Sequence, residues 1–127
     1  MNNQTVLDEL STDQLQQLVV SSLEDFKATD VTVIDVSGKS ALTERLVVAS
    51  GNSTRHVKSM AEHLVVNAKT AGNPPLGVEG AGEGEWVLVD LNDVIVHLML
   101  PQTRAFYNLE KLWEFSSDHR SGISSNV

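Results

Sequence analysis

The sequence contains no cysteine among its 127 residues. This absence excludes a disulfide framework, a thiolate metal site and a cysteine nucleophile, and it agrees with a reducing compartment. No stretch approaches the roughly 20 consecutive apolar residues that a membrane-spanning helix needs. The first residues also lack the basic start and apolar run of a secretory signal. We therefore expect a cytoplasmic protein without a membrane anchor.

Positive charge is scarce as well, because 9 Lys and Arg residues face 17 Asp and Glu residues and the net charge is −8. Affinity for a phosphate backbone comes largely from Lys and Arg side chains that displace counterions. The charge balance therefore argues against direct, sequence-specific binding of nucleic acid and permits a basic protein partner. Acidity is common among soluble proteins, so it favours such a partner only slightly.

The chain length suits one domain with one core. The hydrophobic pattern predicts an α/β fold, a single mixed β-sheet of about five strands flanked by helices in the order α-β-β-α-β-β-β-α. We predict helices over 12–28, from an N-cap at Ser53 to Gly72, and shortly after Pro101. The predicted strands are 31–36, 45–50, 76–79 and two within 84–100. Residues 1–11 would form an N-terminal extension, 12–115 the domain, and 116–127 a flexible polar tail.

The stretch GEWVLVDLNDVIVHLML, residues 84–100, predicts a β-hairpin that turns at Asn92 and Asp93. Because side chains alternate across a strand, this register divides the hairpin into two faces. One face is aliphatic and must belong to the core; it holds Val87, Val89, Leu91, Val94, Val96 and Leu98. The other face is mixed; it holds Trp86, Leu88, Asp90, Ile95, His97 and Met99.

The mixed face permits three interpretations. Asp90 and His97 lie diagonally across the strand pair, where their side chains can meet, and Asp90 could then orient His97 as a general base. The sequence offers no nucleophile for such a pair, so a surface carboxylate beside a partly buried imidazole is the simpler explanation. Tryptophan, methionine and isolated charges among aliphatic residues are also typical of the centres of protein interfaces. A helix of the same domain that covers this face explains the pattern equally well.

A second candidate chemistry lies at SGNS, residues 50–53, which precedes a predicted helix and is similar to the Gly-Ser start of nucleotidyltransferases. A magnesium-dependent enzyme of this kind would use Ser53 with carboxylates such as Asp35 and Asp90. The carboxylate pair expected about ten residues later is missing, because that interval holds a single acid, Glu62, on a helix. No set of metal ligands converges elsewhere in the sequence.

Five segments together resemble the ribosomal silencing factor family, also called the Iojap-like proteins, over residues 15–113. They are DVTVIDVSGKSALTE (30–44), VVASGNSTRHV (47–57), PLGVEG (75–80), EWVLVDLNDVIVHLM (85–99) and RAFYNLEKLW (104–113). Each segment is weak alone, but their order and spacing are specific. The last motif of the family falls on Arg104, Phe106, Tyr107, Leu109, Glu110, Leu112 and Trp113, without separating interface residues from structural ones.

The resemblance implies a protein that binds the fourteenth protein of the large ribosomal subunit, on the face that joins the small subunit. Occupying that face blocks subunit joining and represses translation when nutrients are short. The resemblance implies no enzymatic turnover, no cofactor and no metal, and homodimers are common in the family. The implied sheet is distantly similar to that of nucleotidyltransferases but lacks their catalytic carboxylates.

Combining the mixed hairpin face with this partner predicts a ribosome-facing set of seven residues, Trp86, Leu88, Asp90, Ile95, His97, Met99 and Tyr107. Two departures from the family pattern bear on the fold: Arg45 stands where an apolar residue is usual, and Asn92 replaces a frequent turn glycine. Asparagine tolerates left-handed backbone, so we expect the turn to survive. A nucleotidyltransferase and a dimeric scaffold for another protein remain the alternatives.

Overall fold

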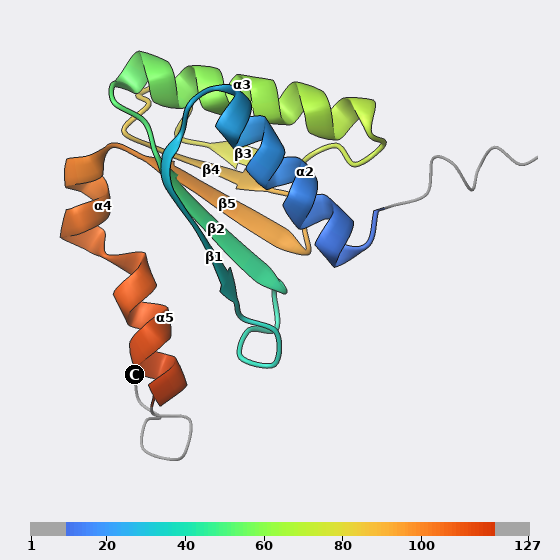
Figure 1. Cartoon of the computed structure of the whole chain (residues 1–127), viewed down its shortest axis with the longest axis vertical. Helices are drawn as coiled ribbons and strands as arrows, with labels where there is room; N and C mark the ends of the chain where they lie inside the picture. Colours follow the sequence, from blue (N-terminus) through green and yellow to red (C-terminus); the bar gives the residue numbers. More distant parts are fainter. Residues whose placement is uncertain (1–9, 119–127) are drawn as a thin grey trace, which may run out of the picture.

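A five-stranded mixed sheet forms the centre of the structure, a computed structural model that describes residues 10–118 (Figure 1). The strands are β1 Thr29–Asp35, β2 Arg45–Ser50, β3 Gly77–Glu79, β4 Trp86–Asp90 and β5 Val94–Met99. The helices are α2 Thr12–Asp25, α3 Thr54–Thr70, α4 Pro101–Tyr107 and α5 Leu109–Asp118. The strand order is β1-β2-β5-β4-β3, in which β2 and β5 are parallel and all other neighbours are antiparallel. The predicted mixed α/β class is confirmed.

Helices α2 and α3 cover one face of the sheet, and α4 and α5 lie on the other side (Figure 1). The main core forms between the first pair of helices and the aliphatic side chains of β2, β4 and β5. Burial of this apolar surface supplies the main drive for folding. No helix within residues 10–118 is long and apolar enough to cross a membrane.

Local signals place the beginnings of α2 and α3 as predicted. Ser11 and Gln14 form a capping box, with the Gln14 N–H donating to Ser11 Oγ at 3.1 Å and the Ser11 N–H donating to Gln14 Oε1 at 2.9 Å. Ser53 caps α3 by accepting the His56 N–H at 3.0 Å. Ser11 therefore caps α2 directly, and the helix begins at Thr12, as predicted.

Helix α2 ends at Asp25, three residues before the predicted end at residue 28. Lys27 adopts left-handed backbone with φ of 60°, and its N–H and that of Ala28 turn back to the carbonyls of Glu24 and Leu23. This closure satisfies carbonyls at the helix end and starts β1 at Thr29, two residues earlier than predicted. The sequence pattern missed it because lysine rarely marks a left-handed cap.

The C-terminal part contains two helices where the pattern predicted one. Asn108 adopts left-handed backbone with φ of 50°, which ends α4, and its side-chain oxygen then accepts the Lys111 N–H of α5 at 3.3 Å. Phe106, in the last turn of α4 before the break, has a side chain that is 78% exposed. Helix α5 continues to Asp118, so the first three residues assigned to the polar tail, 116–118, are helical. Residues 119–127 of that predicted tail and residues 1–9 of the predicted extension lie outside the described residues.

Arg104 connects this C-terminal arm to the sheet. Its guanidinium donates to both carboxylate oxygens of Glu110 at 2.6 and 3.2 Å, to Ser50 Oγ at 2.9 Å and to Thr32 Oγ1 at 3.1 Å. The Arg104 side chain is 11% exposed and Ser50 is 2% exposed. Hydrogen bonding from Arg104 lowers the pKa of the Glu110 carboxyl below its ordinary value. One side chain therefore joins α4, α5, β1 and β2.

Replacing Arg104 by methionine keeps an apolar stem but leaves the buried Ser50 hydroxyl and the Glu110 carboxylate without their donor. We expect Arg104→Met to lower the free energy of unfolding by about 2 kcal/mol, because unmet buried polar groups carry their desolvation penalty. Urea denaturation followed by circular dichroism measures the loss. Arg55→Met, at an exposed position on α3, serves as the control and should change stability by less than about 0.5 kcal/mol. Equal stability of the two variants would contradict the role of Arg104.

Candidate protein interface on the hairpin

The hairpin of β4 and β5 has the register predicted from its sequence. The paired residues are Trp86 with Met99, Val87 with Leu98, Leu88 with His97, Val89 with Val96, and Asp90 with Ile95. Asn92 takes φ of 75° in the turn, and the Leu91 N–H donates to the Val94 carbonyl at 3.0 Å. Asparagine at the turn is therefore compatible with the fold, as expected.

The aliphatic side of the hairpin belongs to the core, as predicted. Its six side chains are at most 5% exposed; they are Val87, Val89, Leu91, Val94, Val96 and Leu98. They pack against α2 and α3, so these helices cover this side of the two strands and leave the opposite side uncovered. We call that opposite side the outer face.

The outer face is partly open, with Trp86, Leu88, Asp90, Ile95 and His97 all half-buried. Met99 differs from the other predicted residues because its side chain is fully buried. On the neighbouring strand, Leu46 pairs with Ile95 and Val48 pairs with His97, and both β2 residues are buried. Met99 and these β2 residues therefore support the outer face from within, and Met99 is not offered to a partner.

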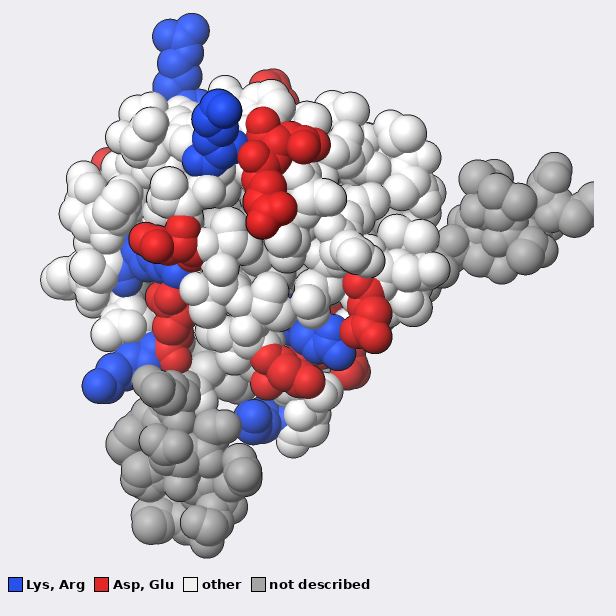
Figure 2. All heavy atoms as spheres, in the orientation of Figure 1, with Lys and Arg blue, Asp and Glu red and all other residues white. Residues whose placement is uncertain are grey.

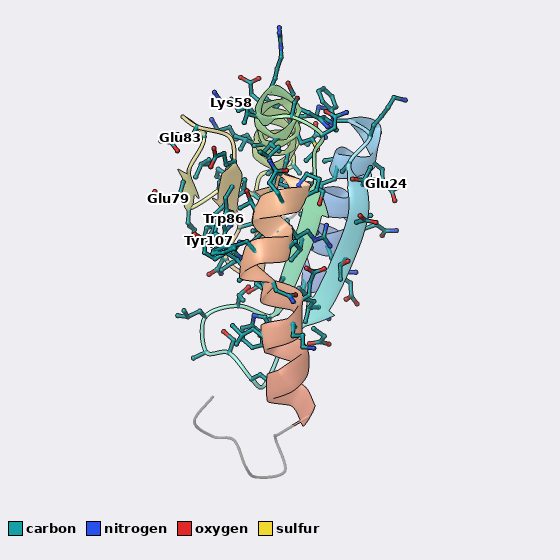
Figure 3. The ribbon with its side chains drawn as sticks, turned by 90° about the vertical axis from the view of Figure 1, so that its left-hand side faces the viewer. Glu24, Lys58, Glu79, Glu83, Trp86 and Tyr107 are labelled. Atoms are coloured by element: carbon teal, nitrogen blue, oxygen red, sulfur yellow. The ribbon has the colours of Figure 1, made fainter. Side chains whose placement is uncertain are left out.

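Trp86 is held in place by two neighbours. Its indole Nε1–H donates to His97 Nδ1 at 3.0 Å, and the two ring centroids are 5.9 Å apart. On its other side, the ring of Tyr107 from α4 lies 4.8 Å away at an interplanar angle of 47°. Figure 3 shows Trp86 and Tyr107 side by side at the end of the sheet where α4 begins. Tyr107 belongs to the C-terminal motif, about 20 residues after Trp86, and was included in the predicted set with the hairpin residues. The structure brings it into one surface with Trp86.

Phe106, the neighbour of Tyr107 on α4, extends this surface. Its ring meets the Tyr107 ring edge-on at a centroid distance of 4.9 Å, and Tyr107 itself is 54% exposed. Rings in this arrangement attract each other beyond their buried area. The only sequence signal for the position was its place beside Tyr107 in the C-terminal motif.

Asp90 and His97 do not form the pair that a catalytic reading requires. Asp90 Oδ1 accepts the backbone N–H of Asn92 at 2.9 Å, so this carboxylate supports the turn. His97 uses Nδ1 to accept the Trp86 hydrogen bond, which requires the neutral ring with its proton on Nε2. Burial lowers the pKa of His97 and favours the same neutral form.

Hydrogen bonds and ion pairs connect the β4–β5 turn and Arg45 to neighbouring elements of the domain. Asp93 accepts the Thr12 hydroxyl of α2 at 3.2 Å, and its carbonyl accepts the N–H groups of Glu44 and Arg45. Arg45 makes ion pairs with Asp13 at 3.1 Å and Asp35 at 3.7 Å. The departure at Arg45 is thus accommodated by carboxylates of α2 and β1.

The residues of a nucleotidyltransferase site do not converge. Asp35 and Asp90 lie at the same end of the sheet but on strands three positions apart, or roughly 14 Å at the usual strand spacing. Ser53 lies beyond the opposite end of β2 and its hydroxyl caps α3. Within the described part of the chain, no three His, Asp or Glu side chains are grouped to hold a metal ion. The geometry therefore does not assemble a two-carboxylate metal site with Ser53.

The buried hydrogen bond to Trp86 predicts a specific titration of His97. Because burial lowers its folded pKa below the ordinary 6.5, the unfolded chain binds more protons between the two values. The free energy of unfolding should be highest above pH 6.5 and decrease as the pH falls through this window. NMR titration of the His97 ring should give a pKa below 6.5, and His97→Gln should flatten the pH dependence of stability. A ring pKa at or above 6.5 would contradict this account.

Comparison with known proteins links this geometry to a family. The family described as ribosomal silencing factor during starvation matches residues 9–126. A ribosomal silencing factor of Zymomonas mobilis is 38% identical over 125 residues, covering 98% of this chain and 92% of the relative. A mouse protein named mitochondrial assembly of ribosomal large subunit protein 1 is 39% identical over 103 residues, covering 79% of this chain and 45% of the relative.

A solved structure is similar to this chain in both fold and sequence. The crystal structure of a Chromobacterium violaceum protein superposes with a TM-score of 0.81 at 42% identity, covering 83% of this chain and 88% of that protein. The family match spans most of the chain, and the relatives agree with it in sequence and fold. The chain therefore belongs to the ribosomal silencing factor family.

Proposed function

We propose that this protein binds the large ribosomal subunit through its fourteenth protein and thereby blocks joining of the small subunit. The observation that carries the proposal is the ordered, half-exposed pair of Trp86 and Tyr107 on the outer face of the hairpin. The name of the mouse relative refers to assembly of the large subunit, which supports a partner on that subunit. The functional consequence is repression of translation when nutrients are limited.

The outer face has the physical properties of an interface centre. Tryptophan and tyrosine contribute strongly to protein binding, and they contribute most when their side chains are ordered before the partner arrives. His97 fixes the indole by a hydrogen bond, and the buried side chains of β2, β4 and β5 hold the strands behind it. Leu88 and Ile95 add apolar area along the outer face. Because the indole is already fixed, docking would cost little side-chain entropy at Trp86.

Charge supports a basic protein partner more than direct contact with RNA. The net charge is −8, and the face in Figure 2 carries scattered acidic and basic side chains without an extended basic patch. An acidic surface steers encounter with a basic partner and repels phosphate groups. The negative charge that would complement a basic partner comes from Asp90 on the outer face and from three glutamates at and between β3 and β4, namely Glu79, Glu83 and Glu85.

The proposed mechanism is steric and needs no turnover, cofactor or metal. When the outer face docks, α2 and α3 project from the opposite side of the sheet as a further layer about 10 Å thick. This layer would occupy space that the small subunit needs. A homodimer and a cytoplasmic location, both expected from the sequence, stay predictions that gel filtration and cell fractionation can check.

Truncation of Trp86 tests the proposed face. We expect Trp86→Ala to weaken binding to purified large subunits about thirtyfold or more, because a buried interface tryptophan contributes about 2 kcal/mol or more. Tyr107→Ala should weaken binding in the same direction. Co-sedimentation measures the affinity, and light scattering of mixed subunits measures their joining.

Leu42→Ala provides the matched control, since Leu42 is 80% exposed on the loop between β1 and β2, away from the aromatic pair. Circular dichroism confirms that each variant is folded. If Trp86→Ala and Tyr107→Ala inhibit subunit joining as strongly as the unchanged protein, the outer face is not the docking surface. If the unchanged protein does not sediment with large subunits, the scaffold alternative replaces the proposal.

A further inference from the structure

A small notch opens beside the aromatic pair, between the turn that precedes β4 and helix α4. Its volume is about 340 Å³, near the lower end of the range for sites that bind small molecules. Trp86 and Tyr107 form its aromatic wall, Thr103 lies at the helix side, and Glu83 and Glu85 line the turn side. Figure 3 shows Glu79 and Glu83 on the same side of the molecule as the two rings.

The turn is held rigidly against β4. Gly80 has φ of 86°, and a Cβ atom there would come within 2.1 Å of the Trp86 carbonyl oxygen. The Gly84 N–H closes the turn on the Gly80 carbonyl at 3.0 Å. By contrast, a Cβ atom on Gly82 would meet no atom within 4 Å, so this part of the notch is open. Gly80 thus allows the turn to lie close to Trp86, and Gly82 leaves the notch open to solvent.

The charges at the notch are all of one sign. Glu83 and Glu85 are exposed, and neither forms an ion pair with a residue whose side chain is described. The stem of Lys58 of α3 lies against Gly84, between the two glutamates in sequence, but Lys58 does not line the notch. The notch therefore combines two aromatic rings with two carboxylates that form no ion pair with a described side chain.

We propose that this notch receives one basic side chain, lysine or arginine, of the protein partner. The inference rests on the proposed function for the identity of that partner. A cation is attracted by the faces of tryptophan and tyrosine rings, and partial exclusion of water strengthens its attraction to nearby carboxylates. A phosphate group would meet only negative charge here. The notch would set the orientation of the docked partner, while the apolar outer face supplies most of the buried area.

Removing the two carboxylates tests the inference on the ribosome. Glu83→Gln with Glu85→Gln should weaken binding to large subunits at least fivefold at about 0.1 M salt, and should reduce the salt dependence of binding. The matched control is Glu24→Gln with Glu62→Gln, which removes the same charge from exposed positions on α2 and α3; Figure 3 shows Glu24 on the far side from the notch. The control should change affinity less than twofold.

A titration with small probes tests the notch without the ribosome. Nα-acetyl-arginine amide and Nα-acetyl-lysine amide should shift the NMR signals of the Trp86 indole N–H and the Gly82 amide. Nα-acetyl-citrulline amide has the shape of the arginine probe without its charge and should shift them at least fivefold less. A larger response to arginine or to lysine identifies the side chain that fits. Equal shifts from the charged and neutral probes, or no shift with either basic probe, would overturn the inference.

The outcomes separate this inference from the proposed function. If Trp86→Ala weakens subunit binding and the double glutamine variant binds as tightly as the unchanged protein, the notch has no such role while the proposed interface stands. If the unchanged protein does not bind large subunits but the basic probes select the notch, the proposed partner is wrong and the cation site remains. Loss of affinity in the double variant but not in its control supports both.

Discussion

The register of β4 against β5 is the constraint on which the rest of the structure depends. Strand β5 lies at the centre of the sheet and pairs with both β2 and β4, so its side-chain alternation assigns residues to both layers of helices. A slip of one residue would move Val96 and Leu98 to the outer face and drive His97 into the core. The turn prevents this slip, because Asn92 accepts left-handed backbone and Asp90 and Asp93 anchor its two sides.

The same register explains why polar residues can lie beside a packed core. His97 is mostly buried, yet its Nδ1 atom accepts a hydrogen bond and its lowered pKa keeps the ring neutral. The hydrogen bond also fixes Trp86, which otherwise could turn about its side-chain bonds. At the same end of the sheet, on the neighbouring strands β2 and β1, Arg104 satisfies Ser50 and Thr32 while it ties α4 and α5 to the strands. Each buried polar group thus positions a segment that forms part of the open surface.

Sequence reasoning succeeded where local signals agree with tertiary packing. Alternation specified the hairpin register, and Ser53 marked the start of α3, because these features depend on neighbouring residues. It failed at Lys27 and Asn108, where left-handed residues end helices that the apolar pattern would continue. It also could not show that Met99 is buried while Trp86 stays half-open, since both share one strand face. That difference depends on tertiary packing around the hairpin, which no periodicity within it determines.

The open surface suits binding better than catalysis for a reason of geometry. A catalytic site needs groups that converge on one reacting atom, whereas here the acids are engaged separately: Asp35 by Ser37, Asp90 by the turn, and Asp93 by Thr12. The aromatic rings, in contrast, form a continuous row from Trp86 through Tyr107 to Phe106. A protein that acts by occupying space needs only such a surface and a rigid domain behind it. The fold supplies both, because the partly exposed hairpin residues lie on the same strands that carry the core.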